Sequence, residues 1–573
     1  MNSFTLRHTA FALILFFSIT LYVDMDRPEI QPWDEGLYAY RARAVLEHNV
    51  WWDQTDYAIG GLYSATYPPL TVDIMAVAMK FFPPNLAVRL FSFLSAIASL
   101  LLIFLIARRF INAEMSLMCI IGLAVTLAWD RYARQGMTDV PVVMFSLLAL
   151  WTVLKISESP KILYAILWGL LFALSFAAAL MSKILVSFLP LLFVVLFLFQ
   201  KFSLSSKIIA IGGVIFGIIL ALPWHLYMFA KYGANFGRAF LAPHIYTAVE
   251  ANTRSLGVGY YINQLIVANP FFILAIIFLL IAIFRFRKIY RKQLDVEKKY
   301  ILVLMFVWFT GLLIVFSLSL TKLPHYLVYL TVPAVLLSAF IYEKYHELFS
   351  SEKIRWLIFS FILISLFWSL NFDLRQDIKL LLSFQKATAD ALVFVLISAI
   401  LLITPLLLKK DKLNKLLNNI MPPVAYTIII ILIIRLIMFN ISNNEPYILG
   451  GKYTADVLKK SGTNSFVYLY HQHNASDSLN PQLAWYTDGW NLGKLADKSF
   501  YPVPMPKDKI GIKEIQSTDL FKKSMLVYYV PDNKNLVFSV ISEVKKTRNI
   551  MFVTKNYIIF GQVIHSRKKG KFI

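Results

Sequence analysis

Two adjacent carboxylates stand near the start of the chain, where the first hydrophobic segment has just ended. They are Asp34 and Glu35, in the stretch Gln31-Pro-Trp-Asp-Glu-Gly-Leu-Tyr-Ala-Tyr-Arg41. Ionisable groups beside a membrane are costly to hold and are usually functional. A carboxylate can take a proton from a reacting hydroxyl group, which is general base chemistry. The alternative is a solvated loop in which Asp34 only caps the next helix.

A second polar cluster occupies a short turn between two later apolar segments. This turn, residues 129–139, contains two arginines and ends at Asp139. We take Asp139 as a second catalytic candidate and Arg134 as a phosphate-binding candidate, because the turn is expected to share a face with Asp34. The alternative is structural: Thr138 or Asp139 caps the following helix, and Asp130 pairs with Arg134.

Basic and aromatic side chains recur at the same membrane boundary. Lys183, Lys322, Arg134 and His325 would converge on the two carboxylate sites, which predicts a pocket for an anionic group such as phosphate. A single interfacial lysine, by contrast, usually extends to the lipid headgroups. Further pocket candidates are Tyr63 and Tyr67 beside a proline pair, and His244 and Arg254 in a later loop. The other rings of the first loop are interpreted as an aromatic anchor belt.

The composition identifies the setting of these residues as a membrane. Of 573 residues, 58% are hydrophobic and only 16% are charged, too few to solvate a globule of this size. Helices of about 20 apolar residues cross a hydrocarbon core of roughly 30 Å. Apolar segments fall near residues 8–23, 86–106, 114–129, 138–154, 162–180, 184–200, 208–228, 263–284, 300–320, 325–342, 354–371, 388–408 and 421–440. We therefore predict a polytopic helical protein with about thirteen transmembrane helices.

The net charge of +23 alone would suggest a nucleic-acid partner, but its placement points to membrane topology. Lysine and arginine recur in six connections that share one side if the N-terminus is cytoplasmic. The other face then carries residues 24–85, 130–137, 181–183, 229–262, 321–325, 372–387 and 442–573. Both carboxylate sites are expected on this extracytoplasmic face, in a bacterial cytoplasmic (inner) membrane.

Two parts of that face have their own predicted structure. The first loop, residues 24–85, is expected to hold interfacial helices over 34–50 and 70–82. Residues 442–573 are richer in charge and contain β-prone runs at 465–470, 525–530 and 551–562, which predicts a soluble α/β domain after the transmembrane domain 1–441. This domain either covers the site, helps to choose the acceptor or acts as a stabilising cap.

No spacing of side chains requires a cofactor. Asp34, Glu35, Asp139 and His244 are of types that bind Mg²⁺ or Mn²⁺, but nothing in their spacing demands a divalent metal. We expect metal-independent chemistry. The lone Cys119 lies in an apolar run, so no intrachain disulfide forms.

Several short motifs occur in an order that resembles a known family. They are Asp34-Glu35-x-x-Tyr38, Pro68-Pro69, Ala87-Val-Arg-Leu90, Ala107-Arg-Arg-Phe110, the turn ending in Asp139, Ser182-Lys183, Leu222-Pro-Trp224 and Phe316-Ser-Leu-Ser-Leu-Thr-Lys-Leu-Pro-His-Tyr326. Over about residues 1–345 this series looks like the bacterial lipid A aminoarabinose transferases, whose plan is shared with protein O-mannosyltransferases.

The resemblance implies a C-type membrane glycosyltransferase fold. It also implies a polyprenyl-phosphate sugar donor and a lipid, protein or glycan acceptor. The family's acceptor-side aspartate corresponds to Asp34. Its donor-phosphate groups correspond to Lys322 or Tyr326 and to one of Arg238 or Arg254. The expected roles are lipid A modification or another glycosylation of the cell envelope.

The chain departs from that family at one point. Aminoarabinose transferases carry a Glu-Lys pair before the proline, where this chain has Thr66-Tyr67-Pro68-Pro69. Lys183 or Lys322 is expected to compensate for the missing lysine.

Two other functions remain as alternatives. A lipid-linked sugar flippase or transporter would tend to show midplane charges and paired repeats, which are not evident here. A surface polysaccharide polymerase or ligase also works outside the membrane with lipid-linked sugars, but usually lacks the early Asp-Glu loop.

Overall fold

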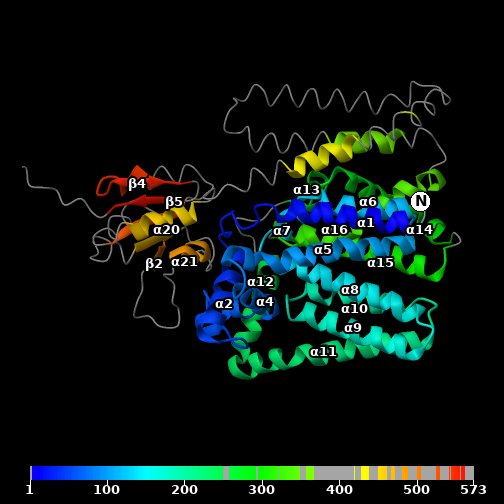
Figure 1. Ribbon diagram of the computed structural model, residues 1–573, viewed down its shortest axis with the longest axis horizontal. Helices are drawn as coiled ribbons and strands as arrows, with labels where there is room; N and C mark the ends of the chain where they lie inside the picture. The colour runs from blue at the N-terminus through cyan, green and yellow to red at the C-terminus, as the bar shows by residue number, and fades with distance from the viewer. Residues whose placement is uncertain are drawn as a thin grey trace, which may run out of the picture.

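A long helical bundle and a small β-sheet at one end of it make up the fold (Figure 1). The computed structural model describes residues 3–249, 257–291, 294–320, 322–348, 356–366, 419, 427–437, 450–460, 466–470, 480–487, 500–504, 524–529, 541–542, 544–554 and 557–561. The predicted apolar segment 388–408 lies outside these residues.

Within the described residues, seven helices are long and apolar enough to cross a membrane. They are α1 (Ser3–Tyr22), α5 (Pro84–Phe110), α8 (Asp139–Glu158), α9 (Ile162–Leu180), α11 (Leu204–Tyr232), α15 (Val296–Leu318) and α16 (Leu327–Leu348) with the short turn η4 (Pro324–Tyr326) before it. One further apolar pair, α6 (Ala113–Ala124) and α7 (Leu127–Ala133), is bent by 64° and forms either a broken span or a re-entrant loop. The prediction of a multi-pass helical membrane protein is confirmed.

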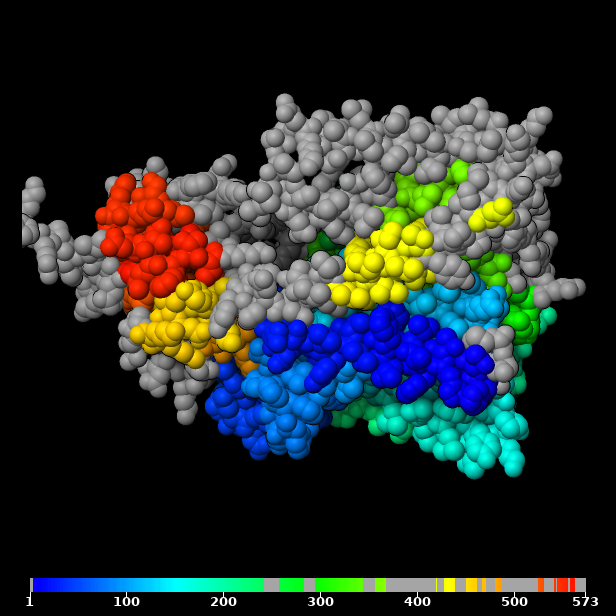
Figure 2. Space-filling model, turned by 45° about the horizontal axis from the view of Figure 1, so that its top comes forward, coloured from blue at the N-terminus to red at the C-terminus, as the bar shows by residue number. Residues whose placement is uncertain are grey.

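The outer helices present apolar side chains where lipid would lie. Helix α1 runs along the outside of the bundle (Figure 2), and its Phe4, Phe11 and Ile19 side chains are more than half exposed. Such exposure is unfavourable in water and favourable in hydrocarbon, so it agrees with a membrane setting.

Three predicted membrane segments are divided in the structure. Residues 184–200 form η2 (Val186–Phe188) and α10 (Leu189–Leu198), and residues 263–284 form α13 (Tyr260–Ala268), η3 (Pro270–Phe272) and α14 (Ile273–Arg291). Residues 114–129 form α6 and α7. Shorter helices cover Trp356–Leu366 and Thr427–Ile437. Hydropathy alone does not detect such breaks, because apolar side chains continue through them.

The first loop folds into short helices at the end of the bundle nearest the sheet (Figure 1). They are α2 (Asp34–His48), η1 (Thr55–Tyr57), α3 (Leu62–Ala65) and α4 (Leu70–Met79), while α12 (Ala234–Val249) lies at the same end. Helices form at both predicted positions, and their place at the membrane interface stays a prediction. Helix α2 ends because Asn49 adopts a left-handed conformation, with φ of 57°, a common way to stop a helix.

The C-terminal region forms a five-stranded mixed sheet. Its strands β1 (Phe466–Tyr470), β2 (Phe500–Pro504), β3 (Met525–Tyr529), β4 (Ile550–Val553) and β5 (Tyr557–Phe560) follow the order β2-β1-β3-β5-β4. Strand β1 is parallel to β2 and β3, while β5 is antiparallel to β3 and β4. Helices α20 (Gly451–Lys460) and α21 (Pro481–Thr487) accompany the sheet. The predicted runs 465–470 and 525–530 form β1 and β3, and the run 551–562 forms the hairpin of β4 and β5. Strand β2 was not predicted.

An ion-pair network joins three helices at the opposite end of the bundle. The Arg109 guanidinium of α5 pairs with Glu158 of α8, and its Nε lies 2.6 Å from Oε1 of Glu297 in α15. This end therefore contains charged groups as well. The polar groups described next lie at the other end, near α2.

Candidate active site

The Asp34 carboxylate is the accessible acid of the site. It is the first residue of α2, and its side chain is 41% exposed. Its Oδ2 lies 3.9 Å from Nδ1 of His325, which follows Pro324 at the start of the η4 turn. A negative charge in the first helical turn is favoured by the helix dipole. Asp34 is thus held at a helix end while remaining reachable by a ligand.

Its neighbour Glu35 is instead fully buried and bound on both oxygens. Nε of Arg89 in α5 donates to Oε1 at 2.8 Å, and Nη2 donates to Oε2 at 3.2 Å. The backbone N–H groups of Gln31 and Gly136 donate to Oε2 and Oε1, each at 2.7 Å. With four donors on one carboxylate, Glu35 acts as an anchor. Its predicted catalytic role is not supported by this geometry and stays a prediction.

This anchor brings the two aspartate sites together. Gly136 lies three residues before Asp139, so the Glu35 carboxylate connects the first turn of α2 to the turn that precedes α8. The approach requires glycine: a Cβ at Gly136 would lie 2.2 Å from Cγ1 of Val88. The expected meeting of residues far apart in sequence therefore occurs through the buried Glu35 carboxylate.

Asp139 forms a buried ion pair of its own. Nζ of Lys183 donates to Oδ1 of Asp139 at 2.7 Å, and both side chains are at most 5% exposed. The Lys183 ammonium also lies 5.8 Å from the ring centre of Tyr326 and 6.0 Å from that of Tyr329. His325 interacts with the Asp139 charge as well, so one imidazole faces both aspartates.

Aromatic side chains pack around these charged groups. The Tyr132 ring meets that of His325 edge to face at 6.0 Å, and Tyr326 stacks on Phe316 at 4.8 Å. Tyr38, one turn after Asp34, is a buried side chain on the same helix. Burial, together with the charges of Asp34 and Asp139, raises the pKa of Tyr38 well above its usual value. Tyr38 therefore lies between the two carboxylate sites as a neutral hydrogen-bonding group.

The loop carrying Tyr63 and Tyr67 is fastened by Arg41 of α2. The Arg41 guanidinium donates to the backbone oxygens of Ser64 and Tyr67, each at 2.9 Å. The Tyr67 ring then packs edge to face on Tyr38 at 5.9 Å, and its pKa is raised by burial and by nearby tyrosine and Asp34 groups. Tyr67 thus lies at the site, whereas Tyr63 is 40% exposed.

Two predicted phosphate ligands make backbone contacts instead. Nζ of Lys322 donates to the carbonyls of Phe316 and Ser317, at 3.2 and 2.6 Å, and to that of Ser319. These carbonyls belong to the end of α15, where a cation is favoured. Burial lowers the pKa of Lys322. Its role in binding the donor phosphate stays a prediction.

Arg134 likewise binds backbone carbonyls, at the end of α1. Its guanidinium donates to the carbonyls of Thr20 and Leu21, each at 3.1 Å, and to that of Val23 at 3.0 Å. These contacts fix the end of α1 against the turn before α8. They make Arg134 a structural group, and its phosphate-binding role stays a prediction.

The remaining candidates come from the segment after α11. Arg238 lies on α12 with an exposed side chain. His244 is on the same helix, but its side chain lies outside the described residues, as does Arg254. Their proposed contacts with a donor phosphate therefore stay predictions.

Three site tyrosines were not predicted as site residues. Tyr38 belongs to the Asp34-Glu35-x-x-Tyr38 motif, and the other two are Tyr132 and Tyr329. The helical spacing of Tyr38 from Asp34 was the one available signal, because residues four apart share a helix face. Tyr132 stands beside Arg131 in the polar turn, whose charged residues were the stronger signal. Tyr329 lies in the apolar helix α16, where a tyrosine resembles any other core ring.

No metal centre emerges among the described residues: no group of three or more His, Cys, Asp or Glu side chains is placed to hold an ion. Metal-independent chemistry stays a prediction, tested below.

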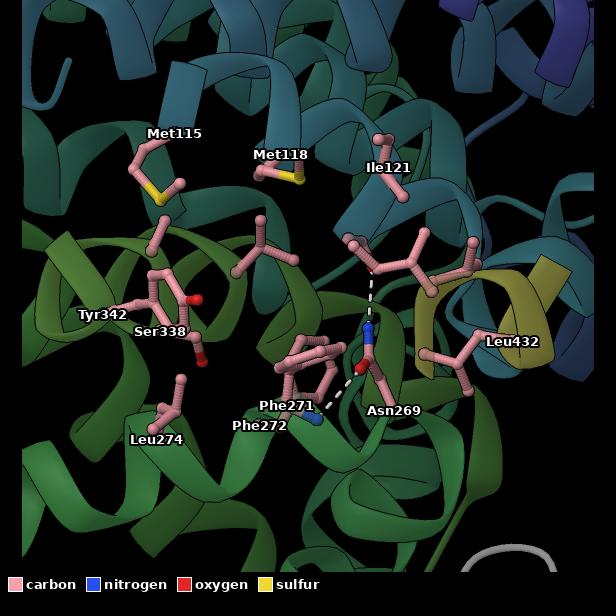
Figure 3. Close-up of a pocket in the computed structure, with 15 residues that line it drawn as sticks. Met115, Met118, Ile121, Asn269, Phe271, Phe272, Leu274, Ser338, Tyr342 and Leu432 are labelled. Carbon is pink, nitrogen blue, oxygen red and sulfur yellow. Dashed lines mark hydrogen bonds between the residues drawn. The ribbon is translucent and has the colours of Figure 1, made fainter. Parts of the chain in front are cut away.

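A separate cavity of about 170 Å³ lies between α6, η3, α16 and the helix Thr427–Ile437 (Figure 3). Its lining is mostly apolar, with Met118, Phe272 and Leu432 among its residues. The Asn269 amide at its edge donates to the carbonyl of Gly122, beside the break between α6 and α7. None of the candidate site residues lines this cavity.

The helical bundle with its small α/β unit has the fold of the solved ArnT structures, which is the fold expected of C-type membrane glycosyltransferases. ArnT from Cupriavidus metallidurans, solved bound to undecaprenyl phosphate, matches with a TM-score of 0.60 at 15% identity, over 96% of this chain and 98% of ArnT. Its apo structure matches with the same TM-score and identity, over 96% and 97%.

At the sequence level, residues 67–227 match the model of the family described as dolichyl-phosphate-mannose-protein mannosyltransferase. No curated protein matches the chain. The resemblance inferred from the sequence motifs is therefore confirmed in its fold, and the predicted fold class is confirmed with it.

Proposed function

We propose that this protein is a glycosyltransferase that moves a sugar from a polyprenyl-phosphate donor to an acceptor hydroxyl at the α2 end of the bundle. The observation that carries the proposal is the half-exposed Asp34 carboxylate facing His325, beside the buried Lys183–Asp139 pair. The fold shared with ArnT, which was solved with undecaprenyl phosphate, supports this donor class.

The arrangement matches what glycosyl transfer requires. Asp34 accepts the proton of the acceptor hydroxyl, whose oxygen attacks the anomeric carbon as the bond to the phosphate oxygen breaks. The polyprenyl phosphate leaves with the bonding electrons, so negative charge grows on it. Cationic and hydroxyl groups such as Lys183, Tyr326 and Tyr67 stabilise such charge. One base and direct displacement lead to inversion at the anomeric carbon.

The site is proposed to open to the extracytoplasmic side of a bacterial inner membrane. The alternation of basic connections along the sequence supports this orientation. The sugar, hexose or pentose, and the acceptor, whether a lipid such as lipid A, a protein or a glycan, are left open by this proposal.

The decisive experiment follows the donor. Purified protein is incubated with a radiolabelled polyprenyl-phosphate sugar and candidate acceptors, and the release of polyprenyl phosphate is measured. A transferase releases it in proportion to product, whereas a flippase moves the intact donor across a vesicle membrane without cleaving it. Transport without cleavage would contradict the proposal.

The Asp34→Asn variant tests the assigned base. The amide keeps the shape of the side chain but cannot take the proton, so turnover should fall by about 10²- to 10⁴-fold. Asp56→Asn is the matched control, because Asp56 is an exposed aspartate of the same loop. Near-normal turnover of folded Asp34→Asn would remove Asp34 from the catalytic role.

A further inference from the structure

The residue that connects the C-terminal sheet region to the active-site loop is Ile30, four residues before Asp34. Its N–H donates to the Tyr486 hydroxyl at 2.8 Å, and its carbonyl accepts from Nε2 of Gln482 at 2.7 Å. Both partners lie on α21, more than 450 positions away in sequence. Each backbone polar group of Ile30 is thus held by the C-terminal region.

The Gln482 side chain is itself hydrogen-bonded to the sheet. Its Oε1 accepts from the Tyr557 hydroxyl of β5 at 2.9 Å, and that hydroxyl also contacts Asn480. Gln482 and Tyr557 are fully buried. Because one end of the amide is taken by Tyr557, the other end is oriented towards Ile30, and the sheet sets its position.

The rest of the contact surface is matched in shape and charge. Helix α21 lies beside α2 (Figure 1), and a Cβ at Gly36 would lie 2.8 Å from Cβ of Pro481. The Arg43 guanidinium sits 4.9 Å from the ring centre of Trp485 and donates to its carbonyl at 3.2 Å.

Helix α20 is also bound to this loop, through the carboxylate of Glu29. Oε1 of Glu29 accepts from the backbone N–H of Lys452 at 2.6 Å. That N–H is in the first turn of α20, where the helix dipole favours a negative charge.

On the membrane side, the same loop holds the start of α2. The N–H of Gln31, the next residue, donates to Glu35, and Arg89 donates to the carbonyl of Glu29, the previous one. Ile30 therefore stands between two contacts that fix the first turn of α2. A shift of Ile30 would also move Asp34, because only three residues separate them along the chain.

We propose that Gln482 and Tyr486 are positioning residues for Asp34, so that the C-terminal region forms part of the active-site framework. The inference rests on the proposed function of Asp34 for its kinetic consequence, but its structural part does not. It assigns the C-terminal region a role beyond covering the site or stabilising the fold.

The test uses full-length Gln482→Leu and Tyr486→Phe. Tyr453→Phe is the matched control, because Tyr453 is an exposed tyrosine of α20 whose ring packs against Phe552 of β4. Misplacement of a catalytic group by about 1 Å can cost about 10²-fold in rate. We therefore expect kcat to fall between about 5- and 100-fold in both variants, with KM for donor and acceptor changed less than about two-fold. An unchanged kcat, or a change confined to the acceptor KM, would overturn the inference.

Hydrogen–deuterium exchange provides a readout that does not depend on activity. Exchange at the amides of residues 30–38 should quicken in both variants, while that of α9 stays unchanged. Unaltered exchange at residues 30–38 would overturn the inference even if the protein proved not to be a glycosyltransferase. Absence of transfer by the wild-type protein, with faster exchange in the variants, would contradict only the proposed function.

Discussion

The Glu35→Gln substitution tests whether a buried ion pair stabilises the end of the bundle that carries the candidate site. Glu35 and Arg89 are at most 1% exposed and share two contacts, at 2.8 and 3.2 Å. Removing one partner of a buried pair costs about 3–5 kcal/mol, because the other charge is left uncompensated. In the glutamine, an NH₂ group replaces one carboxylate oxygen. It then faces N–H donors that the oxygen used to bind, and two donors cannot bond to each other. We expect the free energy of unfolding to fall by about 3–5 kcal/mol.

Arg89→Gln should be more severe. In addition to Glu35, Arg89 donates to the carbonyls of Met25, Pro28 and Glu29, at 2.7 to 2.9 Å. In a double-mutant cycle, the Glu35→Gln/Arg89→Gln protein should lose less stability than the sum of the single losses, because neither charge remains alone.

Unfolding free energies can be obtained by titrating SDS into mild-detergent micelles. The matched control is Glu47→Gln on the same helix, since Glu47 is 57% exposed and lies 3.7 Å from Arg43. Such an exposed pair contributes about 0.3–0.5 kcal/mol, so this variant should resemble the wild type. A loss below about 1 kcal/mol for Glu35→Gln would refute the anchoring role.

Three further predictions follow from the structure and the topology. Burial raises the pKa of Asp73 to about 7, so between about pH 4 and pH 7 the folded protein binds more protons than the unfolded chain. Stability should fall by on the order of 3 kcal/mol as pH rises through this window, and Asp73→Asn should remove the fall; a wild-type curve that is flat there would contradict the assignment. Incubation with EDTA should leave turnover unchanged, and a loss restored by Mg²⁺ or Mn²⁺ would show that the chemistry needs a metal. Alkaline phosphatase, which is active only outside the cytoplasm, should be active when fused after residue 442, and an inactive fusion would reverse the proposed orientation.

Local features of the sequence were sufficient to predict the elements. Apolar runs of membrane-spanning length predicted the spanning helices, because a helix in lipid must satisfy its backbone internally whatever surrounds it. The charges and helical spacing after Trp33 predicted α2, which forms as Asp34–His48. Alternating β-prone residues predicted β1 and β3, but β2, with two prolines in its sequence, carried no such signal.

The partners of the ionisable groups were decided only by the tertiary structure. The sequence placed Asp34, Asp139, Lys183 and His325 at one membrane boundary, and the structure brings them together. It did not indicate that Arg89 would bind Glu35, or that Lys322 would bind the carbonyls at the end of α15.

The physical reason is that spacing along the chain reports which face a residue occupies but not its distance to a residue on another helix. The strength of a charge pair depends on that distance and on burial. The contact of α21 with Ile30 could not be predicted from the sequence either. It joins positions more than 450 residues apart, and it uses the backbone groups of Ile30, which are the same for almost any residue type.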